Sequence, residues 1–267
     1  KLMEVCRMRN TPIITFINKC DREGKSPIEL IDEIEEKLQI KVRPLSWPIG
    51  SGPRFKGVYN IYEKNLNLFS ANKTKIEENL VKITDVNDSK VDDIIGEDPA
   101  ALLREDLELV EGVYDQFDID EYKAGNIAPV FFGSALNNFG VRELLDAFVR
   151  LAPNPQHRPS DGGTIEPNDK KFTGFIFKIH ANIDPKHRDR IAFLRVVSGK
   201  FERNKFYQNS RLDKKMKFSN PYSFLARSKE VVDEAFPGDV IGLYDTGTFR
   251  IGDTLTEGDK LQFKGIP

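Results

Sequence analysis

The sequence predicts an α/β domain with a doubly wound sheet, followed by a domain built as an antiparallel β-barrel. Two short apolar segments, Ile13–Asp21 and Pro129–Ala135, have the composition of buried parallel strands, and each ends in polar or small residues. Beyond residue 170 the apolar pattern changes from a helical period to a period of two. Parallel strands joined by helices, followed by short alternating strands, are typical of these two fold classes in succession.

The first segment, Ile-Ile-Thr-Phe-Ile-Asn-Lys-Cys-Asp, carries the strongest candidate for a binding site. Ligands of open α/β sheets bind at the carboxyl ends of the strands, where Asn18, Lys19 and Asp21 lie. The Asp21 carboxylate can accept hydrogen bonds from N1–H and the 2-amino group of guanine, whereas adenine offers neither donor. Asn18 can donate to N7, and the aliphatic part of Lys19 can lie along the ring. The alternative is an ordinary polar turn, so the assignment needs a second element.

The second segment, Pro-Val-Phe-Phe-Gly-Ser-Ala, supplies that element. Small residues at its end allow backbone N–H groups to approach a ligand closely. The Ala135 N–H can then meet O6 of guanine, and the Ser134 hydroxyl can support the Asp21 carboxylate. The alternative is two unrelated turns, but the two strand ends together favour a guanine site.

The segments around the first strand predict helices. Residues 1–9 read as the end of a helix with Leu2, Val5 and Cys6 on one face. A second helix is predicted after Asp21, because Ser26 can serve as its N-cap, Pro27 suits its first position and Glu29 completes a capping box. Its buried stripe is expected to be Ile28, Ile31, Ile34 and Leu38.

The chain between Asp21 and Ser134 is far longer than the roughly thirty residues that a strand–helix step needs. We therefore expect an inserted subdomain at about residues 44–125, with a small antiparallel sheet. Its strands are expected at Val58–Tyr62 and Asn67–Phe69, followed by a solvated acidic loop at Asp85–Asp98 and a helix from Asp98 to about Phe117. The core face of that helix is expected to be Leu102, Leu103, Leu107, Val110 and Val113.

The remaining chain divides at a segment rich in proline and glycine. A helix at Val141–Leu151 is expected to close residues 1–152, and residues 153–170 are expected to form a linker. The helix is expected to turn Val141, Leu144, Leu145 and Phe148 inward. Residues 171–262 are assigned to the barrel and 263–267 to the start of a connection. Barrel strands are predicted at Phe172–His180 and Arg190–Val197, with weaker candidates at Met216–Phe218, Ser223–Arg227 and Asp239–Leu243.

Composition excludes several classes of protein. The 267 residues carry a formal net charge of −2, so no global basic field indicates nucleic-acid binding. Only Cys6 and Cys20 are present, and they form neither a disulfide framework nor a metal motif. No apolar run has the length of a membrane span, and no signal peptide is visible. We therefore expect a cytoplasmic protein.

The motifs resemble those of the translational GTPases. Asn18-Lys19-Cys20-Asp21 and Gly133-Ser134-Ala135-Leu136 match the base-reading motifs of that family. Three stretches beginning at Arg190, Pro237 and Ile251 match its barrel domain. Longer stretches resemble the class II peptide chain release factors, and Asp184–Arg190 is the most specific of them because elongation factor G differs there.

The resemblance implies how the whole protein would work. Asn18, Lys19, Asp21, Ser134, Ala135 and Leu136 would bind the base of GTP or GDP. The family hydrolyses GTP on the ribosome to recycle the release factors that read stop codons, so ribosomal RNA and proteins and class I release factors are the expected partners. A monomer is expected for the full-length protein.

The phosphate-binding half of the site is absent from this sequence. No Gly-x-x-x-x-Gly-Lys-Ser/Thr loop occurs, and the resemblance places that loop, with its Mg²⁺ ligands, before Lys1. It places a further domain after Pro267. We therefore expect a fragment that carries no catalytic or metal-binding residue, does not hydrolyse GTP alone and exposes a sheet edge near Lys1–Asp21.

One barrel loop concentrates positive charge, with Lys186, His187, Arg188 and Arg190 close together in the sequence. This loop is either an RNA-facing patch or a solvated turn. Two other identities stay open for the protein. One is another translational GTPase such as elongation factor G, and the other is a ribosome-binding module without nucleotide chemistry.

Overall fold

The computed structural model describes residues 2–69, 80–83, 85–181, 190–225 and 228–264. These residues form two compact units, Lys1–Ala152 and Pro153–Pro267. Within the described residues, no helix is both long and apolar enough to cross a membrane.

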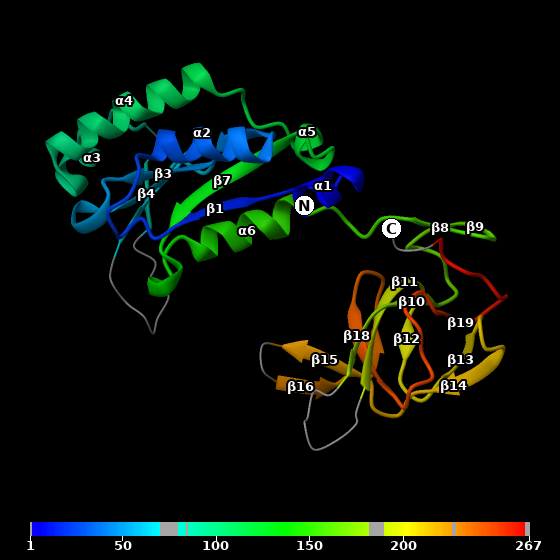
Figure 1. The fold of residues 1–267 in the computed structure, drawn as a ribbon. Coiled ribbons are helices and arrows are strands. Elements are labelled where there is room, and N and C mark those ends of the chain that lie inside the picture. Colours follow the sequence, from blue (N-terminus) through cyan, green and yellow to red (C-terminus); the bar gives the residue numbers. More distant parts are fainter. Residues whose placement is uncertain (1, 70–79, 84, 182–189, 226–227, 265–267) are drawn as a thin grey trace. The chain divides into compact units, whose positions relative to one another are not determined.

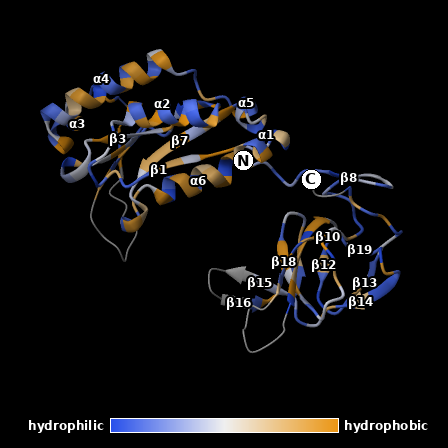
Figure 2. Cartoon of the chain, viewed as in Figure 1, coloured by the Kyte–Doolittle hydropathy of each residue, from blue (hydrophilic) through white to orange (hydrophobic). Residues whose placement is uncertain are grey.

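The first unit is built on a three-stranded parallel sheet with the order β1-β7-β2 (Figure 1). Its strands are β1 (Thr15–Asn18), β2 (Lys41–Pro44) and β7 (Ile127–Gly133). Helix α2 (Pro27–Leu38) covers one face, and helix α6 (Val141–Leu151) covers the other. Alternate residues of β7 serve the two faces: Val130 and Phe132 pack with Ile31 of α2, and Phe131 packs with Ala147 of α6. Figure 2 shows the apolar strands between the two helices.

The start of α2 is the one that its sequence predicts. The Glu29 N–H donates to Ser26 Oγ, and the Ser26 N–H donates to the Glu29 carboxylate at 2.8 Å. Pro27 occupies the first turn, where its missing N–H leaves no hydrogen bond unmade.

The inserted region is a second sheet covered by helices. Four antiparallel strands follow in the order β3-β4-β5-β6, namely β3 (Ser46–Ile49), β4 (Gly57–Asn60), β5 (Asn65–Leu68) and β6 (Leu80–Lys82). The helices are α3 (Ser89–Ile95), α4 (Glu97–Val113) and α5 (Ile119–Lys123), and a 3-10 turn η1 (Gly52–Arg54) joins β3 to β4. One hydrophobic core runs through this sheet, α2 and β7, so the insertion is continuous with the domain that contains it.

Two predictions for this region are wrong. Helix α3 lies within the stretch expected to be a solvated loop, because Asp88 caps it and Val91 and Ile95 are buried one turn apart. In α4, Leu102 and Val113 are 61% and 63% exposed. The buried face is instead Ala100, Leu103, Leu107 and Val110, a stripe rotated toward β3.

Strand β1 and helices α1 and α6 leave more apolar surface exposed than predicted. Strand β1 is the terminal strand and is only half-buried. Helix α1 (Leu2–Met8) has no buried residue. On α6, Leu145 and Phe148 are exposed although both were expected inside, and the buried residues are Ala147 and Leu151.

The second unit contains a curled antiparallel sheet, as expected for a barrel-type domain (Figure 1). The order is β14-β13-β19-β10-β11-β18-β15-β16, and the described strands form a half-barrel with β14 and β16 at its two ends. The eight strands are β10 (Thr173–Ala181), β11 (Arg190–Ser198), β13 (Phe206–Asn209), β14 (Lys214–Lys217), β15 (Tyr222–Leu225), β16 (Ser228–Val231), β18 (Val240–Asp245) and β19 (Thr254–Thr256). A short pair, β12 (Phe201–Glu202) and β17 (Glu234–Ala235), lies beside it.

The segment expected to be a plain linker contains a hairpin of β8 (Arg158–Ser160) and β9 (Gly163–Ile165). The Asp161 N–H donates to the Gln262 carbonyl at 3.0 Å, and Ser160 pairs with Phe263. Ile165 packs with Phe263, so this hairpin is part of the second unit.

Candidate functional site

The two predicted site segments meet at the carboxyl ends of β1 and β7. Asn18 lies directly opposite Gly133 in the parallel register, and the Cys20 N–H donates to the Gly133 carbonyl at 3.1 Å. Lys19 has a φ of 71°, a left-handed conformation that reverses the chain after β1. This turn carries Asp21 back toward the end of β7.

Asn18 fastens the two loops to each other. Its Oδ1 atom accepts from the Lys19 N–H at 2.8 Å and from the Ala135 N–H at 2.9 Å. One amide oxygen therefore holds both loops at the strand ends. The Ala135 N–H, which was expected to face guanine O6, is engaged by Asn18 in this structure.

Asn137, which was not predicted as a site residue, connects Asp21 to Ser134. The Asn137 Nδ2 group donates to Ser134 Oγ at 2.9 Å and to Asp21 Oδ2 at 3.3 Å. Ser134 was expected to support Asp21 directly, and it does so through this amide. Asn137 ends the 3-10 turn η2 (Ala135–Asn137), just before Asn138 in the left-handed conformation. An asparagine in a turn after a strand was the only available signal, and turns commonly contain it.

The second oxygen of Asp21 is the unusual atom of the site. Asp21 Oδ1 is buried and has no hydrogen-bond partner among the described residues. A buried carboxylate oxygen without a donor is costly, so such an atom indicates a place where a ligand donor belongs. Lys19 and Leu136 are exposed at the rim of the site.

The backbone beneath the site leaves no room for a side chain at Gly133. Ser134 and Phe139 exchange two backbone hydrogen bonds of 3.0 Å. A Cβ atom on Gly133 would lie 2.4 Å from the Phe139 carbonyl oxygen and 2.7 Å from Phe16 Cζ. Only glycine allows the end of β7 to pass so close to the Phe139 carbonyl and the Phe16 ring.

A pocket of about 360 Å³ adjoins the loop that follows β1. Its polar lining includes Asn18, Lys19, Arg22 and Ser51. The Gly52 N–H donates to the Cys20 carbonyl at 3.0 Å, so turn η1 of the insertion braces this loop from the side.

Cys20 is a packing residue of this loop. Its Sγ donates to the Ile17 carbonyl at 3.5 Å, and burial raises the pKa of the thiol to about 11. The protonated form is therefore favoured by folding, and the thiolate fraction at pH 8 is very small.

We expect iodoacetamide to alkylate Cys20 slowly at pH 8 and faster as the pH approaches 11, measured by mass spectrometry with the Cys20→Ser variant as a control. Rapid alkylation of Cys20 at pH 7 would contradict this.

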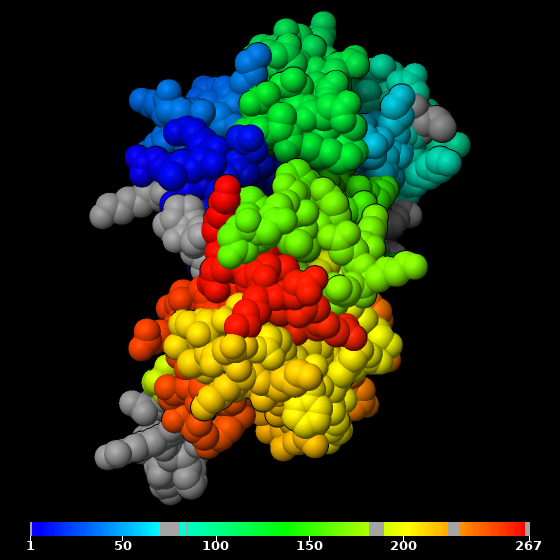
Figure 3. All heavy atoms as spheres, turned by 90° about the vertical axis from the view of Figure 1, so that its right-hand side faces the viewer, coloured from blue at the N-terminus to red at the C-terminus, as the bar shows by residue number. Residues whose placement is uncertain are grey.

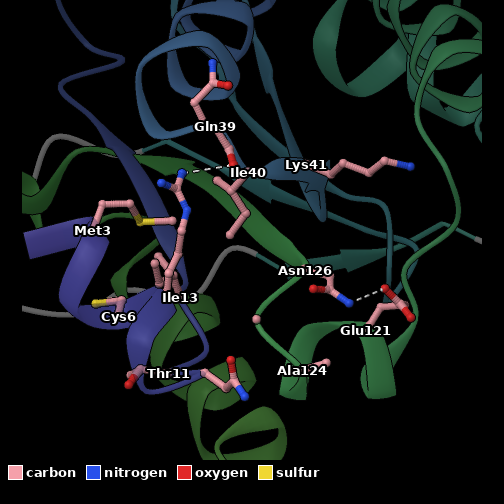
Figure 4. Close-up of a pocket in the computed structure, with 13 residues that line it drawn as sticks. Met3, Cys6, Thr11, Ile13, Gln39, Ile40, Lys41, Glu121, Ala124 and Asn126 are labelled. Carbon is pink, nitrogen blue, oxygen red and sulfur yellow. Dashed lines mark hydrogen bonds between the residues drawn. The ribbon is translucent and has the colours of Figure 1, made fainter.

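A larger pocket of about 570 Å³ lies at the opposite edge of the sheet, where β1, β2 and β7 begin (Figure 4). Met3 and Cys6 of α1 lie on one side of it and Ile40 on another, and Asn126 Nδ2 donates to Glu121 at 2.9 Å. The guanidinium of Arg7 donates to the Leu38 and Gln39 carbonyls. The Arg7 guanidinium, the strongest hydrogen-bond donor of this pocket, is therefore already bonded within the protein. No predicted site residue lines the pocket.

Metal ligation is not supported in the described part of the chain, where no group of three or more His, Cys, Asp or Glu residues is placed to hold a metal ion. The predicted RNA-facing loop falls largely outside the described residues, because Lys186, His187 and Arg188 lie there. Arg190 is described, and its Nε lies 3.3 Å from Asp245 Oδ2 in an ion pair.

Comparison with known proteins supports this arrangement. Residues 1–154 match the family described as elongation factor Tu GTP binding domain, and residues 171–258 match elongation factor G domain 2. A crystal structure of a protein from Thermus thermophilus has the same fold, with a TM-score of 0.67 and 18% sequence identity over 96% of this chain. This chain spans 38% of that protein. The match to the GTP binding domain covers more than half of the sequence, and the chain therefore belongs to the translational GTPases.

Proposed function

We propose that Asp21, with Asn18, Lys19, Ser134, Ala135 and Leu136 around it, reads the guanine base of GTP and GDP. The observation that carries this proposal is the buried, unpartnered Asp21 Oδ1 beside a carboxylate oxygen already held by Asn137. The N1–H and 2-amino groups of guanine are adjacent donors that match the two oxygens of one carboxylate. Asn18 and Asn137 fix the loops, so the carboxylate is oriented before the base arrives.

We further propose that the whole protein is a class II release factor, which uses GTP hydrolysis to dissociate stop-codon-reading factors from the ribosome in the cytoplasm. The resemblance at Asp184–Arg190 supports this choice, and the match to elongation factor G domain 2 favours the second candidate, an elongation factor G-like translocase. The protein with its phosphate-binding segment should be assayed on two ribosomal complexes with GTP. Loss of labelled class I release factor from post-termination ribosomes would support a class II release factor. Movement of transfer RNA would support an elongation factor G-like translocase.

The chain of residues 1–267 is expected not to hydrolyse GTP by itself. Phosphoryl transfer depends on positioning the phosphates and neutralising their charge, and this sequence contains no phosphate-binding loop. A longer protein would hold Mg²⁺ through that loop. Phosphate release should therefore stay at the ribosome-only background when this chain is added. Release that is stimulated by ribosomes and removed by Asp21→Asn would contradict the prediction.

A ribosome-binding module without nucleotide chemistry would bind ribosomes but neither guanosine nor GDP.

A further inference from the structure

The orientation of the Asp21 carboxylate depends on a single side chain among the described residues. Rotation about the Cβ–Cγ bond of an aspartate has only broad preferences, so the rotamer alone does not fix the plane of the carboxylate. Asp21 Oδ2 accepts one hydrogen bond, from Asn137 Nδ2 at 3.3 Å, and the buried Asp21 Oδ1 accepts none. The Asn137 amide is therefore the contact that determines which way the two oxygens face.

Asn137 is itself held in place by the end of β7. Its Nδ2 group donates to Ser134 Oγ at 2.9 Å, and its backbone N–H donates to the Ser134 carbonyl at 3.0 Å. Ser134 is 1% exposed, and its backbone exchanges two hydrogen bonds with Phe139. Phe139 packs in the main core of the first unit. A chain of contacts therefore runs from that core through Ser134 and Asn137 to Asp21, so a fixed part of the fold orients the carboxylate.

Recognition of guanine at two points requires that orientation. The N1–H and 2-amino groups of guanine point in the same direction within the plane of the ring. Both can reach the two carboxylate oxygens only when the carboxylate is nearly coplanar with the base. Inosine has the N1–H group but lacks the 2-amino group, so a single oxygen can hold it over a wider range of orientations. The orientation of the carboxylate therefore matters more for guanosine than for inosine.

We propose that Asn137 is a positioning residue that gives the site its preference for guanosine over inosine. It holds the Asp21 carboxylate where the two oxygens can meet the N1–H and 2-amino groups together. Both N–H groups of its amide are used, on Ser134 and Asp21, so the effect on the base passes through Asp21. This inference rests on the proposed function, because it requires that Asp21 reads the base, and it adds the residue on which selection of the 2-amino group depends.

A simpler explanation is that Asn137 only stabilises the turn. It ends η2 and precedes Asn138, which has a φ of 53°, and asparagine is common in such turns. Replacing a residue with that role alone would lower the affinities for guanosine and inosine by the same factor, because both nucleosides need the same loop. Replacing a positioning residue would lower the affinity for guanosine more. The ratio of the two affinities therefore distinguishes the explanations, and it does not depend on the fraction of folded protein.

The test uses the full 267-residue chain, with guanosine and inosine titrated by ligand-observed NMR, which measures weak binding. The wild type should bind guanosine at least about tenfold more tightly than inosine, because a hydrogen bond to a charged group contributes that much. Asn137→Ala should lower the affinity for guanosine by about tenfold and the affinity for inosine by about twofold or less. The guanosine-to-inosine ratio should therefore fall about fivefold or more.

The matched control removes an equivalent amide at the other edge of the sheet. Asn126 also donates its side-chain amide to a carboxylate, that of Glu121 at 2.9 Å. It lines the pocket that α1 and α5 share, and Figure 3 shows the face of the molecule on which α1 is dark blue and α5 is green. Asn126→Ala should leave both nucleoside affinities, and hence their ratio, unchanged.

Asn137→Asp separates the shape of the side chain from its N–H groups. The new side chain has nearly the same size, but at about pH 7.5 it offers only acceptors and adds a negative charge beside Asp21. The guanosine-to-inosine ratio should then be as low as in Asn137→Ala. Two carboxyl groups at hydrogen-bond distance share one proton at lower pH, and that proton can replace the amide donor. At about pH 5 the ratio in Asn137→Asp should therefore recover toward the wild-type ratio at the same pH, whereas the ratio in Asn137→Ala should not.

The outcomes separate this inference from the proposed function. If the wild type prefers guanosine and the ratio is unchanged in Asn137→Ala, Asp21 remains the base-reading residue and the role of Asn137 is rejected. Equal losses for the two nucleosides in Asn137→Ala would establish the turn-stabilising role instead. A fall in the ratio that Asn126→Ala reproduces would also reject the inference, because it would not be specific to the site. A wild type that binds neither nucleoside would reject the proposed function and this inference with it.

Discussion

Asp21→Asn should convert the site from a preference for guanine to a preference for xanthine. Xanthine has a carbonyl in place of the 2-amino group, so the asparagine amide can accept from N1–H and donate to that carbonyl. The same amide places an N–H against the 2-amino group of guanine, and the wild-type carboxylate meets the xanthine carbonyl with like charge. Hydrogen bonds to charged groups contribute about 1.5–3 kcal/mol each, so each protein should discriminate by about 100-fold or more.

The comparison should use GDP and xanthosine diphosphate, measured by isothermal titration calorimetry, and then guanosine and xanthosine. The nucleosides test the base contacts alone, since this chain has no phosphate-binding loop. Asp93→Asn, at an exposed position on α3, is a control that makes the same chemical change elsewhere. If both proteins prefer guanine, Asp21 does not read the base. If neither protein binds any of the four compounds, the chain does not read a guanine base, and a ribosome-binding module without nucleotide chemistry becomes the favoured interpretation.

Local interactions made much of the fold predictable. The capping box of Ser26 and Glu29 lies within four residues, so the start of α2 follows from the sequence alone. The two apolar strands and the change of period near residue 170 depend on short patterns in the same way. The meeting of the two candidate segments follows from them, because neighbouring parallel strands bring their carboxyl ends together.

The wrong predictions concern positions at which packing between elements determines which residues are buried. A helical pattern identifies an apolar face, but the neighbours select which part of that face is buried. On α4 the selected stripe includes Ala100 and excludes Leu102. Asn137 was missed for a related reason, since its contacts with Asp21 exist only after β1 and β7 are paired. The charges of Asp85, Asp88, Asp92 and Asp93 similarly concealed the short helix in which Val91 and Ile95 are buried.

Trp47 connects the insertion to the site and is expected to give the largest loss of stability. It is completely buried, its Nε1 donates to Asp106 on α4 at 2.9 Å, and its ring meets Phe132 edge-on at 5.6 Å. Phe132 lies two residues before Ser134, and its N–H donates to Ser46 Oγ at 3.0 Å. Strand β3 therefore supports β7 by both backbone and side-chain contacts.

Trp47→Ala should lower the free energy of unfolding by about 3–5 kcal/mol, because it opens a cavity between α4 and β7. That is a large part of the roughly 5–15 kcal/mol that stabilises a typical domain. Trp47→Phe keeps a ring against Phe132 and should lose less than half as much. Urea unfolding followed by circular dichroism measures both variants.

The same experiment decides whether the insertion is an independent domain. Since one core includes Trp47, Ile31 of α2 and Val130 of β7, residues 2–152 should unfold in a single transition. Guanosine binding should then fall with the folded fraction in Trp47→Ala, at urea concentrations where the wild type still binds. A separate early transition that leaves guanosine binding intact would show that the insertion folds by itself. The loops that follow β1 and β7 would in that case depend only on the three-stranded sheet and its two helices.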